Sequence, residues 1–165
     1  MTYSDRKGST NSDGSPLFAT DYDKAREAEI CTLVEQEWHC SMMPFGPLCP
    51  VDFYAIRDGR MVGVMELKSR THKAYHYPTV FLNVRKWIAL SMASAGLGVP
   101  AIFMVRFTDE IRFINVAKVD ATKFKMGGTK KIVKSHTDIE PVIEVPVTDM
   151  TALATRPRAT TSCGS

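Results

Sequence analysis

Apolar residues recur with two different periods along the chain, and the change of period marks where helices and strands are expected. Between about residues 23 and 38 the apolar positions are three or four residues apart: Ile30, Leu33, Val34 and Trp38. This spacing predicts an amphipathic helix. Two strand-like runs follow at about residues 51–56 and 61–68, joined by Asp58-Gly59, a typical hairpin turn.

The next stretch predicts a third strand, a second helix and two more strands. Residues 79–82 favour a strand, and Asn83 then suits the cap of a helix over about residues 84–95. The face expected to be buried on this helix carries Val84, Trp87, Ile88, Ser91, Met92 and Ala95. The apolar run 101–107 predicts a buried central strand, and residues 111–116 an edge strand beside it.

The remaining segments are less regular. The prolines of residues 40–50 predict a loop, and residues 69–78 form a second loop. Residues 118–134 suit a loop or a loose hairpin, and residues 141–147 a short strand whose prolines favour an edge. The order αβββαββ predicts an α/β (α+β) fold, a mixed sheet flanked by helices.

Length and composition predict one domain. A chain of 165 residues with 44% apolar residues can bury one core. We expect a flexible N-terminal arm over residues 1–20, a single domain over 21–150 and a flexible tail over 151–165. No apolar run approaches the roughly 18 residues of a membrane span. The four cysteines lack CxxC spacing, so we expect free thiols and an intracellular setting.

Charge is distributed unevenly, although the net charge is only +3. Residues 118–134 contain six lysines and one acid, Asp120, whereas acidic residues concentrate between positions 21 and 37. Such polarity can steer an anionic polymer to one side of a protein. A solvated lysine-rich loop is the alternative interpretation.

The predicted hairpin carries the candidate chemistry. Asp52 opens its first strand, and Glu66 and Lys68 close its second. Residues two apart in a strand share a face, and the hairpin brings Asp52 near them. Two carboxylates and an ammonium at one sheet end suit a divalent cation and an activated water. The alternative is an Asp52 side chain that bonds a loop amide and a Glu66–Lys68 pair on an exposed face.

Two further groups are candidates for contact with nucleic acid. Loop 69–78 alternates basic and aromatic side chains that can contact phosphates or stack on bases: Arg70, Lys73, Tyr75 and Tyr77. Tyrosines in a loop can equally cover the edge of a core. Arg85 and Lys86 lie in the first turn of the second helix, where the helix dipole disfavours cations, so a phosphate is one reason for their presence.

The hairpin motif resembles a known nuclease signature. Pro50-Val51-Asp52, thirteen residues and Glu66-Leu67-Lys68 are similar to the PD-(D/E)XK motif, and the element order resembles the core of that family. Arg70 and Lys86 resemble basic residues of its small phage-type and homing-endonuclease-like members. Val51 separates the proline from the aspartate, a departure from the motif that leaves the proposed ligands intact.

The resemblance implies a restriction-endonuclease-like core and a metal site. Asp52, Glu66 and the Leu67 backbone carbonyl would bind Mg²⁺, for which Mn²⁺ would substitute, and Lys68 would orient or help deprotonate a water. A glutamate of the first helix would complete the site. Glu27 is the better candidate, because it lies beside the apolar stripe, whereas Glu29 lies well off it.

The resulting expectation is a metal-dependent DNA endonuclease, either structure-specific for junction or branched DNA or site-specific. Since two symmetric cuts usually need two active sites, a homodimer or higher homo-oligomer is expected. If the chain is phage-encoded, it would act in the cytoplasm of a bacterial host. A catalytically inactive nuclease-fold module for DNA binding or assembly is one alternative, and an interaction protein unrelated to nucleic acid is another.

Overall fold

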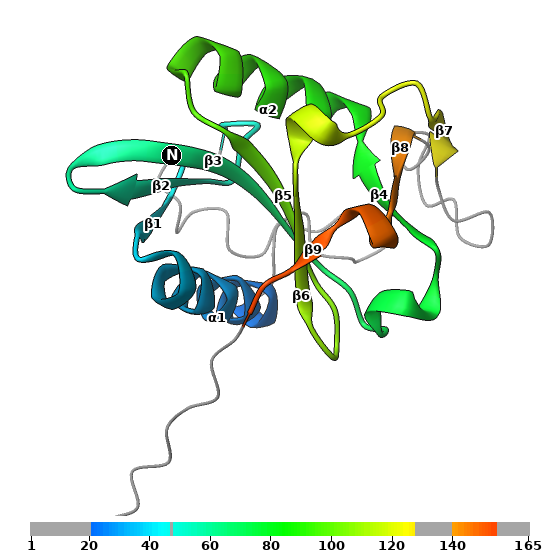
Figure 1. Cartoon of the computed structure of the whole chain (residues 1–165), viewed down its shortest axis with the longest axis horizontal. Coiled ribbons are helices and arrows are strands. Elements are labelled where there is room, and N and C mark those ends of the chain that lie inside the picture. Colours follow the sequence, from blue (N-terminus) through cyan, green and yellow to red (C-terminus); the bar gives the residue numbers. More distant parts are fainter. Residues whose placement is uncertain (1–20, 47, 128–139, 155–165) are drawn as a thin grey trace, which may run out of the picture.

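A six-stranded mixed sheet forms the centre of the computed structural model, with one helix packed on each face (Figure 1). The structure describes residues 21–46, 48–127 and 140–154. The sheet has the strand order β1-β2-β3-β5-β6-β9. Its strands are β1 (Ser41–Pro44), β2 (Phe53–Arg57), β3 (Arg60–Ser69), β5 (Ala101–Arg106), β6 (Ile111–Asn115) and β9 (Thr151–Ala152). Strands β3 and β5 run parallel, and the other neighbours are antiparallel.

A second, antiparallel sheet of three strands lies beside the first, with the order β4-β8-β7. Its strands are β4 (Thr79–Asn83), β7 (Phe124–Gly127) and β8 (Glu140–Pro146). The helices are α1 (Asp21–Trp38) and α2 (Val84–Leu97), and short 3₁₀ helices lie at Ala74–His76, Val116–Lys118 and Val147–Asp149. This arrangement confirms the predicted α+β class, because a helix packs against each face of a mixed sheet.

Local signals in the sequence explain several boundaries. Asp58 and Gly59 have φ angles of 51° and 71°, which is the left-handed pair that a tight β2–β3 hairpin requires. The Asn83 side chain accepts a hydrogen bond from the Arg85 amide and caps α2, as predicted. At the other end Gly98 has φ 65° and closes the helix in the left-handed conformation.

Strand β3 divides its side chains between two cores. Val64 packs in the cluster that includes Leu90 of α2, whereas Met65 and Leu67 pack in the cluster that includes Ile30 of α1. Because side chains alternate along a strand, Glu66 and Lys68 share the α2 face with Val64. The hydrophobic pattern of β3 therefore decides which face carries the candidate site.

Several strands do not occupy the positions in the sheets that the sequence predicted. Residues 41–44, expected in a loop, form β1 and pair with β2. Strand β4 joins the small sheet, not the central one, and β8 lies in the middle of that small sheet. Pro141 and Pro146 are tolerated because they lie at the two ends of β8. Strand β6 is not an edge, because β9 pairs with its outer side.

The domain extends past the expected boundary at residue 150. Thr151 and Ala152 form β9, and Leu153 is buried beside α1 and β3. The expected N-terminal arm, residues 1–20, and the rest of the expected tail, residues 155–165, lie outside the described residues. In the described part of the chain, neither helix combines the length and apolar character needed to span a membrane.

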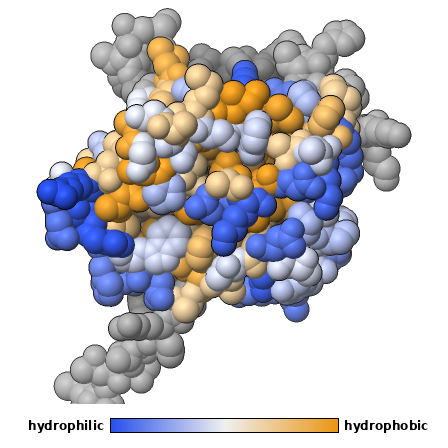
Figure 2. Space-filling model, turned by 45° about the horizontal axis from the view of Figure 1, so that its top comes forward, coloured by the Kyte–Doolittle hydropathy of each residue, from blue (hydrophilic) through white to orange (hydrophobic). Residues whose placement is uncertain are grey.

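The buried face of α2 also differs from the expected one. Leu90 is fully buried, whereas Ile88 and Met92 are exposed, Met92 by 70%. Figure 2, with the α2 side turned forward, shows apolar side chains gathered on this surface. The helix is apolar on both sides, so its hydrophobic pattern alone does not identify the side that faces the sheet.

Candidate active site

Asp52, Glu66 and Lys86 form a three-membered ionic cluster on the α2 face of the sheet. The Lys86 ammonium lies 2.7 Å from Asp52 Oδ1 and 2.7 Å from Glu66 Oε2. Glu66 projects from β3, Asp52 directly precedes β2, and Lys86 lies in the first turn of α2. The structure therefore brings together the two predicted carboxylates, with a cation bridging them.

Asp52 is held at the end of the β2–β3 ladder. Its backbone carbonyl accepts a hydrogen bond from the Phe45 amide at 2.9 Å. Its side-chain Oδ2 accepts a hydrogen bond from the Leu67 amide at 3.2 Å. The paired residues of the two strands end at Phe53 and Met65, so the carboxylate continues the ladder by one step. This leaves Oδ1 directed to the cluster.

Glu66 is the buried member of the cluster, with only 9% of its surface exposed. Burial, and then the neighbouring Asp52 carboxylate, raise the pKa of Glu66 to about 8, against the opposing effect of Lys86. Glu66 Oε2 is buried, and its ion-pair partner among the described residues is the Lys86 ammonium at 2.7 Å. A buried carboxylate oxygen without such a partner is costly.

The geometry explains a cation in the first turn of α2. Burial alone would lower the pKa of Lys86, but the attraction of Asp52 and Glu66 outweighs burial and holds that pKa above its usual range. The sequence suggested a phosphate as the partner of this lysine. In the structure the partners are the two carboxylates.

Lys68 lies on the same face of β3 but points to the small sheet. Its ammonium donates a hydrogen bond to the Phe81 carbonyl of β4 at 3.2 Å. Burial, and then the nearby Arg70 guanidinium, lower the pKa of Lys68. A lysine with a lowered pKa is suited to proton transfer near neutral pH. The alternative interpretation, a Glu66–Lys68 pair on an exposed face, is therefore not the arrangement observed.

The donor set suits a hard divalent cation. Asp52 Oδ1 and Glu66 Oε2 both lie 2.7 Å from the same positive charge. Carboxylate and carbonyl oxygens are the ligands that Mg²⁺ prefers. The described residues contain no cluster of three or more His, Cys, Asp or Glu side chains arranged to hold a metal. A metal here would therefore depend on two carboxylates, with the Leu67 carbonyl and water as further ligands.

The side-chain contacts of Glu29 lie outside the ionic cluster. Glu29 makes a bidentate pair with Arg106 at the end of β5, at 2.5 and 3.0 Å. Glu27 is partly buried and lies close enough to Cys31 to help raise the pKa of that thiol, after burial and Glu35. The helix itself packs on the opposite face of the sheet from Glu66.

The predicted DNA-contacting residues lie in two places. Loop 70–78 is tied to the β5–β6 turn, since the Thr108 amide donates to the His72 carbonyl and the Ala74 amide to Asp109 Oδ1. Lys73, Tyr75 and Tyr77 are exposed on this loop, and Arg70 is partly buried at its start. Arg85 is exposed on α2, one residue from Lys86.

A mixed sheet that carries Asp52, Glu66 and Lys68 at one end, between two helices, defines a nuclease core of the PD-(D/E)XK class. The family model described as "Phage putative PDDEXK endonuclease" matches residues 14–153. The chain belongs to this family. The predicted family is thereby confirmed.

Solved structures support the same fold. Hjc, a Holliday junction resolvase from the archaeal hyperthermophile Archaeoglobus fulgidus, is similar with a TM-score of 0.50 and 14% sequence identity. The similarity covers 75% of this chain and 89% of that one. A comparison with curated proteins found no match. At this identity the structural similarity establishes the fold alone.

Proposed function

We propose that this member of a nuclease family is a metal-dependent endonuclease that hydrolyses phosphodiester bonds in DNA. The observation that carries the proposal is the pairing of Asp52 and Glu66 through a single cation, next to a lysine whose pKa is lowered. Phosphodiester hydrolysis needs a Lewis acid and a group that manages the proton of the attacking water. The cluster and Lys68 provide residues for both tasks.

In this proposal Asp52, Glu66 and the Leu67 carbonyl would hold Mg²⁺, or Mn²⁺ in its place. The bound cation would make a coordinated water more acidic and offset negative charge on the phosphate. Lys68, held by the Phe81 carbonyl, would orient the attacking water and accept or share its proton. Glu27, and failing that Glu29, is the proposed further member of the site; because α1 packs on the other face of the sheet, the side chain would have to reach the cluster past the end of the sheet.

The substrate is proposed to be DNA that departs from a regular duplex. The similar Hjc fold belongs to a Holliday junction resolvase, and loop 70–78 presents cationic and aromatic side chains beside Lys68. Arg70, Lys73, Tyr75, Tyr77, Arg85 and Lys86 are the proposed DNA contacts. Site-specific cleavage of ordinary duplex remains the alternative specificity.

A homodimer or higher homo-oligomer is part of the proposal, because paired cuts on two strands need two active sites. Helix α2 offers the surface for it. Ile88, Met92 and Leu97 are all exposed, by 44%, 70% and 51%. Apolar side chains gathered in this way often mark a contact between protein molecules.

A panel of labelled DNA structures, incubated with Mg²⁺ and with Mn²⁺, tests the activity. We expect cleavage by the parent protein and its loss in Asp52→Ala and Lys68→Ala, with melting curves that show both variants to be folded at the temperature of the assay. Asp149→Ala, which removes an exposed carboxylate from a 3₁₀ helix, is the matched control. If Asp52→Ala cuts as well as the parent, the site assignment is wrong. Salt-sensitive binding without any cutting would favour the inactive DNA-binding module.

A further inference from the structure

A cavity of about 370 Å³ lies beside Lys68, between loop 70–78 and the small sheet. Its volume is within the range of small-molecule sites, roughly 300–1,000 Å³. The side chains that matter for its chemistry are Arg70, His72, Tyr77, Phe81, Lys125 and Glu144. Phe81 lines the cavity, and its backbone carbonyl accepts the hydrogen bond from the Lys68 ammonium, so the cavity lies close to Lys68.

Tyr77 gives the cavity an aromatic surface that is both exposed and held in place. Its ring makes edge-to-face contacts with His72 and His76, with centroids 4.9 and 4.5 Å apart. The residue nevertheless stays 53% exposed. Tyr75, by contrast, is covered on its ring by the Arg112 guanidinium at 4.8 Å and does not line the cavity. Tyr77 is therefore the ring available for stacking.

The charged groups of the cavity suit a phosphate next to such a stacked ring. Arg70 is partly buried at the cavity wall, and burial lowers its pKa, a sign that its guanidinium is poorly solvated. Lys125 is fixed by two contacts: its ammonium lies 2.5 Å from Glu144 Oε1 and 4.8 Å from the Phe81 ring centroid. Positioned cations beside an aromatic ring are the usual features of single-strand recognition.

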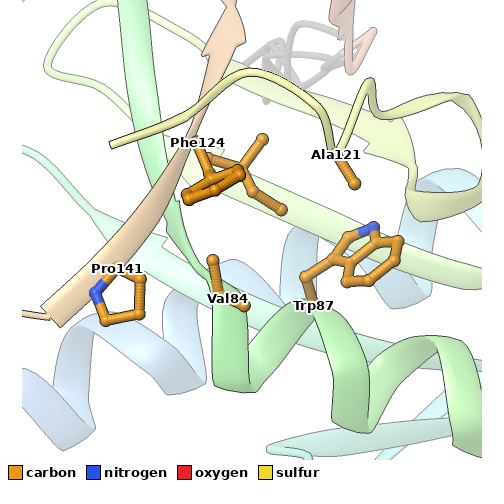
Figure 3. A pocket seen from close by; sticks show the side chains of 6 residues that line it. Val84, Trp87, Ala121, Phe124 and Pro141 are labelled. Carbon is orange, nitrogen blue, oxygen red and sulfur yellow. The ribbon is translucent and has the colours of Figure 1, made fainter. Parts of the chain in front are cut away.

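A second cavity shows the contrast. It has a volume of about 180 Å³ and lies between the start of α2 and the small sheet (Figure 3). Val84, Trp87, Ala121, Phe124 and Pro141 line it, so its walls are apolar. The buried Trp87 Nε1 is its one polar group without a hydrogen-bond partner in the described part of the chain. Only the first of these two cavities therefore has charged side chains that could bind the phosphate of a nucleotide.

We propose that the cavity beside Lys68 binds one unpaired nucleotide of the DNA strand, with the base stacked on Tyr77 and a phosphate on Arg70. This inference rests on the proposed nuclease function and names its substrate class, DNA with an unpaired nucleotide near the cut. A base inside a regular duplex is stacked on both sides and cannot reach the Tyr77 ring. Substrates that already contain unpaired nucleotides avoid the cost of unstacking.

Binding measured by fluorescence anisotropy in EDTA tests the inference without cleavage. The probes are a labelled duplex with a short unpaired gap and the same duplex fully paired. We expect Tyr77→Ala to weaken binding of the gapped probe by about 5- to 150-fold, the usual contribution of one stacked base, with little change for the paired probe. Tyr77→Phe should retain binding, and Phe124→Ala, which removes an exposed ring at the second cavity, should behave as the parent. Melting curves of all variants check the fold.

The outcomes separate this inference from the proposed function. Equal losses on both probes, or no loss in Tyr77→Ala, would overturn the nucleotide site while leaving the endonuclease proposal intact if the parent still cuts DNA in Mg²⁺. Retained binding in Tyr77→Ala but not in Tyr77→Phe would also overturn it. A parent protein that neither binds nor cuts either probe would overturn both.

Discussion

Replacement of Lys86 by methionine should destabilise the metal-free protein and strengthen its binding of a divalent cation. Methionine keeps the length of the side chain but removes the ammonium that lies 2.7 Å from both Asp52 and Glu66. The Asp52 carboxylate and the Glu66 carboxyl group, whose pKa is already raised to about 8, would then face each other without a positive charge. The same gap is the proposed place of Mg²⁺, so the lysine and the metal compete for it.

The size of the expected destabilisation follows from how deeply the side chains of Lys86, Asp52 and Glu66 are buried. Removal of one partner from a fully buried ion pair costs about 3–5 kcal/mol, whereas an exposed pair contributes about 0–1 kcal/mol. The side chains of Lys86, Asp52 and Glu66 are 26%, 28% and 12% exposed, so the cluster lies between these limits. We expect a loss of about 2–3 kcal/mol, which is a fall of roughly 5–10 °C in Tm for a chain of this size.

The assay is thermal unfolding in EDTA at neutral pH, followed by calorimetric titration with Mg²⁺. Lys86→Met should melt at lower temperature than the parent in EDTA and recover stability as Mg²⁺ is added, because a bound ligand stabilises the folded state. Its Mg²⁺ affinity should exceed that of the parent, since no ammonium has to be displaced. Arg85→Met removes an exposed cation from the neighbouring position of α2 and is the matched control.

The prediction is wrong if Lys86→Met and the parent protein have the same Tm in EDTA. It fails equally if the parent binds Mg²⁺ as tightly as Lys86→Met does, because the ammonium would then not occupy the cation position. A similar fall in Tm for Arg85→Met would indicate a general effect of charge in the first turn of α2, not a specific bridge between Asp52 and Glu66.

Three further predictions concern Glu66, the α1 glutamates and the outer face of α2. The folded Glu66 carboxyl, with its pKa raised to about 8, binds a proton more tightly than the unfolded one, so stability in EDTA should fall as pH rises from the unfolded pKa to about 8. Tm against pH for Glu66→Gln should lack this part of the slope, and parallel profiles would contradict the prediction. Glu27→Gln should reduce DNA cleavage more than Glu29→Gln, because the Glu29–Arg106 pair is partly exposed and water can replace the lost contact. A larger loss of cleavage in Glu29→Gln would instead place Glu29 in the site. Met92→Glu should convert the proposed homo-oligomer to a monomer in sedimentation analysis. Lys118→Glu, on an exposed 3₁₀ helix, is the control. An unchanged molecular mass of Met92→Glu would exclude the outer face of α2 as the interface.

The hairpin and its motif were predictable because their determinants are local. Alternation along residues 61–68 fixes the face of Glu66 and Lys68, and the left-handed Asp58-Gly59 pair fixes the turn that returns Asp52 to them. A one-residue shift of register between Ala55 and Ile56 then places Asp52 level with Glu66, where the register of the turn alone would have placed it level with Met65. No information from distant parts of the chain is needed for this step.

Contacts between distant segments could not be predicted in the same way. Lys86 is 34 residues from Asp52 in the sequence, and its partners depend on how α2 crosses the sheet. The packing side of α2 was predicted only in part. Val84 and Trp87 pack against the core as expected, whereas Ile88 and Met92 are exposed although they are as apolar as the residues that are buried. The one available signal was a cation in a first helical turn, which indicates an anion but does not say which one.

The small sheet links the two halves of the proposed mechanism through one residue. Phe81 gives its carbonyl to the Lys68 ammonium, while its ring lies under Lys125 at the wall of the nucleotide cavity. Strand β4 in turn is paired along its whole length with β8, so the position of Phe81 is fixed by a strand more than 50 residues away in the sequence. A nucleotide that moves β4 would therefore move the acceptor that holds Lys68. In the proposed mechanism, the placement of Lys68 next to the cluster and the binding of a nucleotide in the cavity would depend on the same short strand, so β4 would contribute to catalysis without a catalytic side chain of its own.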